Sequence, residues 1–151
     1  MVVAAAVSGC GSSAKPTSVD SGYTPSMRAA LSAANRVAVD LTTFDYRTLD
    51  AFYAKMKAEG TATFNQNLQS TRAETTAYDQ RLKVISEGGV VASAAKPVTA
   101  DGTVTVLLFV DQRLRSNGAK TGLLEQVRVQ MVMKRVNGRW LVDQATVSGS
   151  S

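Results

Sequence analysis

The sequence predicts an α+β fold in which three amino-terminal helices pack on a curved, four-stranded antiparallel sheet. The apolar residues repeat about every 3.6 positions in the first half of the chain and every second position in the second half. Near the end, Asn137-Gly138 favours a two-residue hairpin turn between two strands. A chain of 151 residues has the length of one domain, so the helices and strands are expected to share one core.

The first helix is expected from Ser26 to near Thr43. Thr24 or Ser26 can cap it around Pro25, a residue suited to a first helical turn. Its apolar residues are spaced three and four positions apart, which places them on one stripe. The stripe consists of Met27, Ala30, Leu31, Ala34, Ala38 and Leu41.

Two further helices are expected, one over residues 48–59 and one over residues 61–82. Thr48 can cap the first of them, and Gly60 ends it. In the last helix Phe64 and Leu68 form an apolar side, whereas residues 69–76 are weakly amphipathic. That middle part predicts a mostly exposed helix, with a surface covered by a partner as the alternative.

The strands are expected to begin after Gly88-Gly89, with a first strand over residues 90–98. Asp101-Gly102 then turns the chain into a strand over residues 103–113, and two more strands meet at Asn137-Gly138. A two-residue turn there sets Val136 against Arg139 and Met133 against Val142. It also sets Met131 against Gln144.

One face of the last two strands gathers apolar side chains, and two interpretations of it remain open. The cluster could be the floor of an apolar pocket that holds a lipid or steroid, since Met is deformable. It could instead be a sheet face covered by the first helix, which is favoured because that helix needs a hydrophobic partner. The residues are Val129, Met131, Met133, Trp140 and Val142.

The opposite sheet face supplies the candidate interface. Leu107 and Phe109 alternate with an apolar set formed by Val104, Val106, Leu108 and Val110, so both faces of this strand are expected to be covered. Arg128 and Lys134 share that second face in the next strand. Two interpretations of this face remain open. It could be solvated, or it could contact another protein or a second copy of the chain through Leu107, Phe109, Arg128 and Lys134.

The composition excludes several kinds of chemistry. There is no histidine and one cysteine, which removes His-based acid/base catalysis, Cys–His and Ser–His–Asp nucleophiles and the usual zinc sites. The net charge of +5 is spread thinly, with nine bases and seven acids before Val84 and eight bases and five acids from Val84 onward. Nucleic-acid binders usually cluster their charge, so no nucleic acid, cofactor or metal is expected.

Residues 1–23 are expected to form an anchor-like segment and linker ahead of a domain at 24–151. Val7-Ser8-Gly9-Cys10 resembles the end of a bacterial lipoprotein signal, in which Cys10 would be lipidated. The segment lacks a positively charged start, and its apolar part is short. A lipoprotein or membrane-anchor segment and a plain start with an incidental cysteine therefore both remain open.

Two blocks resemble the Mce-associated membrane proteins of actinobacteria. The first is Leu-Thr-Thr-Phe-Asp-Tyr-Arg-Thr-Leu-Asp at 41–50, and the second is Arg-Val-Asn-Gly-Arg-Trp-Leu-Val at 135–142. The resemblance covers about Ala29 to Val147 and implies a cone-shaped domain of the NTF2-like or cystatin-like kind. The motif residues that would preserve this domain are Asp45, Tyr46, Arg47, Leu49, Asp50, Gly138, Arg139 and Trp140.

The same resemblance implies a function. It suggests a non-enzymatic accessory subunit of an Mce-type lipid importer, held by an amino-terminal anchor at the extracytoplasmic face of the cytoplasmic membrane. The partners would be Mce-type transporter proteins or other envelope proteins. One alternative is a small isomerase or dehydratase that uses Asp111, or Asp45 with Tyr46, as base and donor. Another is a carrier that holds lipid in the apolar cone.

Overall fold

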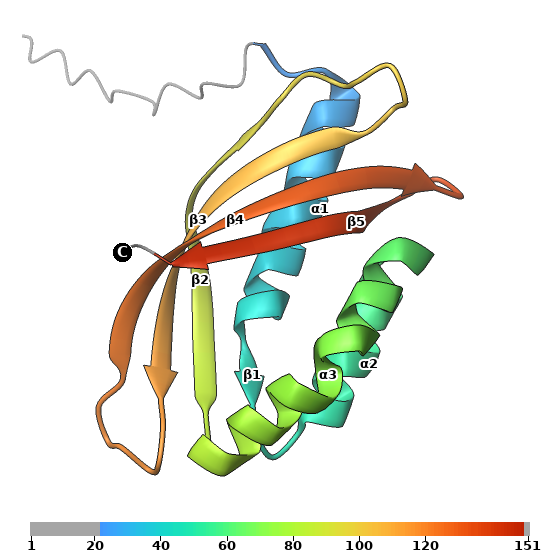
Figure 1. The fold of residues 1–151 in the computed structure, drawn as a ribbon. Helices are drawn as coiled ribbons and strands as arrows, with labels where there is room; N and C mark the ends of the chain where they lie inside the picture. Colours follow the sequence, from blue (N-terminus) through green and yellow to red (C-terminus); the bar gives the residue numbers. More distant parts are fainter. Residues whose placement is uncertain (1–21, 150–151) are drawn as a thin grey trace, which may run out of the picture.

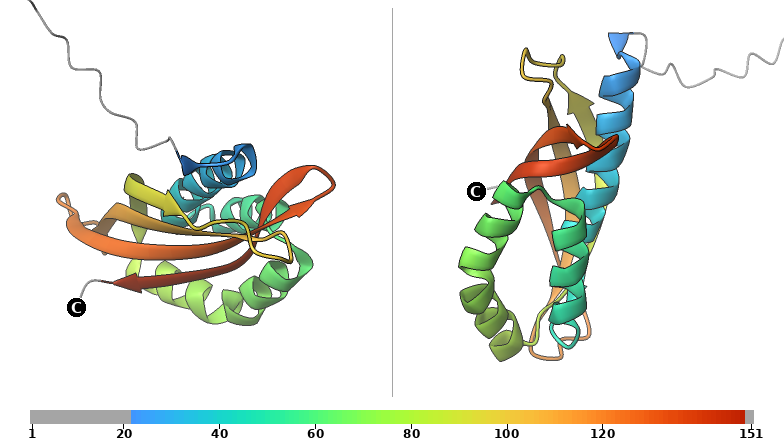
Figure 2. Two further views of the ribbon diagram at one scale, coloured as in Figure 1. Left: turned by 90° about the horizontal axis from the view of Figure 1, so that it is seen from above. Right: turned by 90° about the vertical axis from the view of Figure 1, so that its right-hand side faces the viewer.

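The computed structural model describes residues 22–149. The elements follow in the order α1 (Pro25–Thr42), β1 (Phe44–Asp45), α2 (Leu49–Glu59), α3 (Ala62–Leu82), β2 (Ile85–Ala95), β3 (Val104–Arg115), β4 (Leu123–Val136) and β5 (Arg139–Gly149). The strands lie side by side in chain order, and each pair is antiparallel. The curled sheet forms a half-barrel around α1, while α2 and α3 lie beside it (Figures 1 and 2).

This arrangement confirms the α+β class and corrects the number of strands from four to five. The additional strand is β1, in which Phe44 pairs with Ser86 and Asp45 with Ile85. A strand of two residues is too short to show an alternating pattern, and it follows directly on the last turn of α1. The segment between the first two helices therefore also forms one edge of the sheet.

Helix α1 begins where its sequence predicts. The Thr24 hydroxyl accepts a hydrogen bond from the Met27 N–H at 3.2 Å, and Pro25 occupies the first turn. Thr48 precedes α2, but its side chain makes no capping hydrogen bond. None of the helices within residues 22–149 is long and apolar enough to cross a membrane. Cys10 and nearly all of the expected anchor segment lie outside the described residues.

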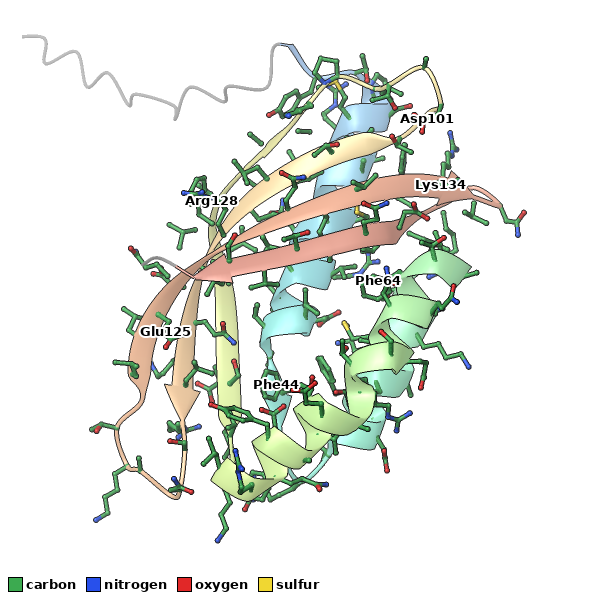
Figure 3. All side chains as sticks on the ribbon, in the orientation of Figure 1. Phe44, Phe64, Asp101, Glu125, Arg128 and Lys134 are labelled. Atoms are coloured by element: carbon green, nitrogen blue, oxygen red, sulfur yellow. The ribbon has the colours of Figure 1, made fainter. Side chains whose placement is uncertain are left out.

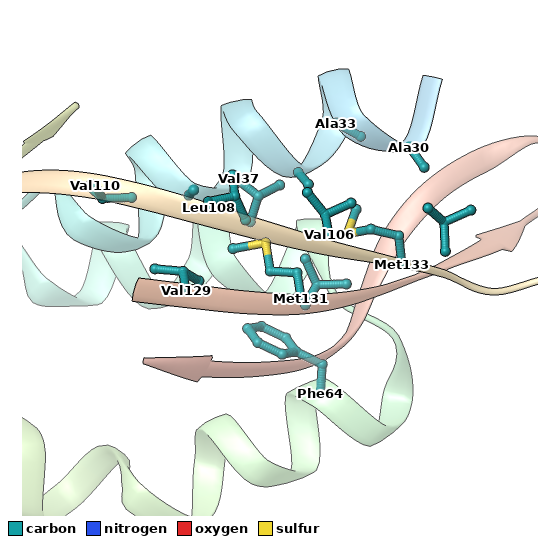
Figure 4. Close-up of a cluster of buried hydrophobic side chains, with 14 of the residues drawn as sticks. Ala30, Ala33, Val37, Phe64, Val106, Leu108, Val110, Val129, Met131 and Met133 are labelled. Carbon is teal, nitrogen blue, oxygen red and sulfur yellow. The ribbon is translucent and has the colours of Figure 1, made fainter. Parts of the chain in front are cut away.

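The core lies between α1 and the concave face of the sheet. Ala30, Ala34 and Ala38 are completely buried, and their small side chains let α1 approach the strands closely. Phe64 of α3 reaches the same cluster from beside β5 (Figure 4). The fully buried sheet residues are Val104, Val106, Leu108, Val129, Met131, Met133 and Val142, while Trp140 is partly buried against them. The apolar cluster of the last two strands thus forms part of the core.

Gly88 and Gly89 do not separate the helices from the sheet, because both lie inside β2. A Cβ on Gly88 would lie 1.8 Å from the Thr42 hydroxyl oxygen, so glycine lets β2 pass close to the end of α1. No atom lies within 4 Å of the corresponding position on Gly89. The strand consequently begins at Ile85, five residues earlier than predicted.

The predicted hairpin register holds only next to its turn. Val136 pairs with Arg139 and Met133 with Val142, but the register then shifts, and Met131 pairs with Ala145 instead of Gln144. The shift lies where the start of α3 meets β5. The Thr61 N–H donates to the Val142 carbonyl at 2.9 Å, and its hydroxyl donates to Asp143 at 2.7 Å. This long-range contact is invisible in the local sequence.

Candidate protein-contact surface

The strands that bury one row of side chains in the core expose the alternate row on the outer face of the sheet. In β3, Leu108 is completely buried, whereas Phe109 is 45% exposed. Leu107, two positions before Phe109, is partly exposed on the same face. Two of the four predicted interface residues therefore lie on an uncovered surface, where their hydrophobic side chains are available for contact.

Phe109 lines a hollow on this face. It pairs with Arg128 of β4 on one side and with Ala92 of β2 on the other. The Arg128 guanidinium carbon lies 5.7 Å from the centre of the Phe109 ring, a cation–π contact. Val91, which is 63% exposed, stands at the bulge in β2 and completes the apolar wall.

The polar side of this hollow is formed by a residue pair of β3 and β4 that lies two positions further along the strands than Phe109 and Arg128. Asp111 pairs with Gln126, and the Gln126 amide donates to the Asp111 carboxylate at 3.2 Å. The hollow has a volume of about 240 Å³ and reaches Ser148 at the end of β5. We call the set Val91, Phe109, Arg128 and Asp111 the outer-face site.

The outer face carries more positive than negative charge. Among the described strands, alternation places five cations on it, which are Arg113, Arg115, Arg128, Lys134 and Arg139. The carboxylates on the same face are Asp45, Glu87 and Asp111. Asp45 is already paired with Arg47, and Glu87 with Arg115 at 3.0 Å. A partner with acidic side chains is therefore complementary to this face.

Lys134 lies on the outer face but apart from the outer-face site. It is six residues further along β4 than Arg128, which corresponds to about 20 Å in a strand. Figure 3 shows the two labelled side chains on separate stretches of β4. The structure therefore brings Phe109 and Arg128 together, with Leu107 beside them, and leaves Lys134 near the hairpin.

The block at residues 45–50 forms the connection between β1 and α2. Asp45 accepts hydrogen bonds from the Arg47 side chain, and this contact lowers the pKa of the Asp45 carboxyl. The Tyr46 N–H donates to the Val84 carbonyl at 3.0 Å, and Leu49 is buried. Asp50 pairs with Arg72 of α3 at 2.7 Å. Each of these contacts fixes the path of the chain.

The second block forms the hairpin between β4 and β5. Asn137 and Gly138 have positive φ angles of 48° and 80°, as a two-residue turn requires. Arg139 then pairs with Val136, and Trp140 pairs with Arg135. The geometry of the turn therefore accounts for Asn137 and Gly138 in the second block.

Sequence reasoning missed a second hollow, located where β1 meets the ends of β2 and β3. It has a volume of about 290 Å³, and its basic and aromatic lining includes Tyr46, Arg47, Lys83 and Arg115. These residues lie far apart in the chain, so no spacing signal joins them. No group of three or more Cys, Asp or Glu side chains suited to a metal occurs within residues 22–149.

No family model and no curated protein matches this sequence. Three solved structures resemble the fold. The periplasmic domain of DotI has a TM-score of 0.71 and 14% identity, and the match covers 85% of this chain and 99% of that one. An IcmL-like type IV secretion system protein from Legionella pneumophila has a TM-score of 0.64 and 13% identity, and the match covers 86% of this chain and 96% of that one. A periplasmic fragment of TraM has a TM-score of 0.58 and 12% identity, and the match covers 84% of this chain and 100% of that one.

These comparisons correct the assignment to the Mce-associated proteins and to lipid import. The structural neighbours include periplasmic parts of DotI and TraM and an IcmL-like type IV secretion system protein, and no family model supports the Mce resemblance. The physical reason lies in the two blocks that suggested it. A helix–strand–helix connection and an Asn-Gly hairpin closing on Trp140 are solutions to folding problems that unrelated families share.

Proposed function

We propose that this protein is a component of a type IV secretion-like complex on the extracytoplasmic side of the cell envelope, and that it acts by protein contact without catalysis. The observation that carries the proposal is the uncovered outer face of the sheet. The similarity to DotI, the IcmL-like protein and TraM supports the envelope setting through a shared fold.

The chemistry of the outer-face site suits a protein partner. Aromatic and arginine side chains contribute most of the binding energy in many interfaces. Phe109 and Arg128 are such a pair, already held together by their cation–π contact. The excess of positive charge around them favours a partner surface that combines an apolar side chain with carboxylates.

The carboxylates once considered for catalysis have other partners. The Asp45 carboxyl is bound by Arg47, and its lowered pKa makes it a weaker base. Asp111 accepts a hydrogen bond from Gln126 on an open face. The lowered pKa of Asp45 and the surface position of Asp111 support a role in contact.

The test is affinity purification of the tagged full chain from its native envelope, followed by mass spectrometry of the proteins that accompany it. We expect components of a type IV secretion system among them. Phe109→Asp combined with Arg128→Glu should reduce their recovery by about tenfold or more, because both central contacts are lost. Circular dichroism should confirm that the variant remains folded.

Lys96→Glu supplies the matched control, because it reverses a charge in the exposed loop after β2. It should leave the recovery of the partners unchanged. Equal recovery with the wild-type chain and the double variant would exclude the outer-face site as the contact. Accompanying proteins that include no secretion component would overturn the proposed complex.

A further inference from the structure

The segments that line the second hollow lie at the end of the fold opposite the start of α1 (Figure 1). Four separate segments meet there, which are the β1–α2 connection, the end of α3, the start of β2 and the loop after β3. Arg115 is six residues beyond Phe109 in β3, about 20 Å along the strand. The hollow is therefore separate from the outer-face site and does not depend on the proposed function.

Positive charge dominates this hollow. Arg47, Lys83 and Arg115 line it. Arg47 is paired with Asp45, and Arg115 is paired with Glu87 at 3.0 Å. Within residues 22–149 Lys83 has no ion pair, so its charge is uncompensated.

The two paired arginines retain hydrogen-bond donors. Arg47 uses its Nε and Nη2 atoms for Asp45, and Arg115 uses Nη2 for Glu87. A guanidinium has five N–H groups, so each side chain keeps donors that no partner in the described chain occupies. The hollow therefore combines one free ammonium with two guanidinium groups that can still donate.

Lys83 occupies a strained backbone position at the edge of the hollow. Lys83 ends α3 with φ 50° and ψ 51°, in the left-handed region where glycine or asparagine is favoured. Asn117 and Gly118 in the facing loop also have positive φ, and the Asn117 N–H donates to the Leu82 carbonyl at 2.7 Å. Strained residues of this kind gather at functional sites.

We propose that this hollow binds a phosphate-type oxyanion. Lys83 supplies the uncompensated charge, and Arg47 and Arg115 donate hydrogen bonds from the other sides, with the Tyr46 side chain on the lining. A carboxylate is planar and is satisfied by one guanidinium, whereas a tetrahedral dianion matches cations placed around a hollow of about 290 Å³. The phosphate can be free inorganic phosphate or the headgroup of an anionic phospholipid.

The test is a titration of the ¹⁵N-labelled full chain followed by NMR. One arm adds inorganic phosphate against sodium chloride of equal ionic strength, and the other adds vesicles of phosphatidylglycerol against vesicles of phosphatidylcholine. We expect saturable shifts of the Lys83, Asn117 and Gly118 amides with phosphate. Binding of phosphatidylglycerol vesicles alone would identify the headgroup as the source of the same chemistry.

Substitutions at Lys83 separate binding from structure. Lys83→Gly should weaken phosphate binding by about tenfold, the loss of one charged hydrogen bond, and should keep or raise the melting temperature because glycine relieves the left-handed backbone. Lys83→Arg should retain binding, and Lys96→Gln at the other end of the sheet should have no effect.

Two results would overturn the proposal. One is the absence of saturable shifts with both phosphate and phosphatidylglycerol. The other is unchanged phosphate affinity in Lys83→Gly together with a lowered melting temperature. That combination would mean that Lys83 serves the carboxyl end of the α3 dipole alone.

Discussion

Leu107 and Leu108 are neighbours in β3, and they represent the two faces of the sheet. Leu108 lies under α1 and is completely buried, whereas Leu107 is partly exposed on the outer face between Ala94 and Gln130. The inner face is closed by α1 and by Phe64 of α3. The outer face has no such cover in residues 22–149 and carries Phe109 and Arg128. In the same strands, the inward-facing residues thus stabilise the fold, and the alternate, outward-facing residues are available for contact with a partner.

The largest expected effect comes from truncating the two leucines. Leu108→Ala should lower the free energy of unfolding by about 2–5 kcal/mol, because it leaves a cavity in a packed core. Leu107→Ala should lower it by about 1 kcal/mol or less, since it removes a partly exposed side chain. Urea denaturation of both variants measures the difference. Equal losses would mean that the outer face is as tightly packed as the inner one.

The two glycines of β2 give the next largest contrast. Gly88→Ala should destabilise the fold by about 1–3 kcal/mol, because its Cβ would collide with the Thr42 side chain. That side chain cannot move freely, since its hydroxyl donates to the Ala38 carbonyl at 2.7 Å. Gly89→Ala meets open space and should stabilise the strand by about 0.5 kcal/mol. A tolerated alanine at position 88 would contradict the close approach of β2 to α1.

The smallest expected effect concerns a buried charge in the helical layer. Asp79 of α3 is 6% exposed, and burial raises its pKa above the ordinary value of 3.8. The folded chain therefore binds this proton more tightly than the unfolded chain, and stability falls as the pH rises from about 3.8 through the raised pKa.

Asp79→Asn removes this titration and should give a higher melting temperature than wild type at pH 7. The gap should close near pH 3, where the wild-type carboxyl is protonated in both states. Asp111→Asn on the open outer face is the control, and thermal melts at the two pH values supply the measurement. An equal difference in melting temperature between Asp79→Asn and wild type at pH 7 and near pH 3 would show that protonation of Asp79 does not cause the difference.

Much of the fold could be predicted because local signals agree with the final structure. Thr24 and Pro25 set the start of α1, and Asn137-Gly138 sets the hairpin. The errors have long-range causes. Gly88 is needed for contact with Thr42, and the register shift lies where Thr61 bonds to Val142 and Asp143. Neither contact leaves a periodic pattern in the sequence.

Of the two candidate sites, one follows from a local sequence pattern and the other depends on long-range contacts. Phe109 and Arg128 were both selected from the sequence because strand alternation places them on the outer face, and pairing makes them neighbours. Lys83 and Arg115 were not selected, because the hollow they line forms only when the ends of several elements come together. Alternation within a strand can be predicted locally, but convergence of loops depends on the complete topology.

The length of α1 sets a distance between two ends of the molecule. Its 18 residues span about 27 Å from Pro25 to Thr42. The domain begins at the amino-terminal end of this helix. Strand β1 follows its carboxyl-terminal end, where the second hollow lies. The start of α1 is therefore about one helix length away from that hollow, and the helix fixes this separation.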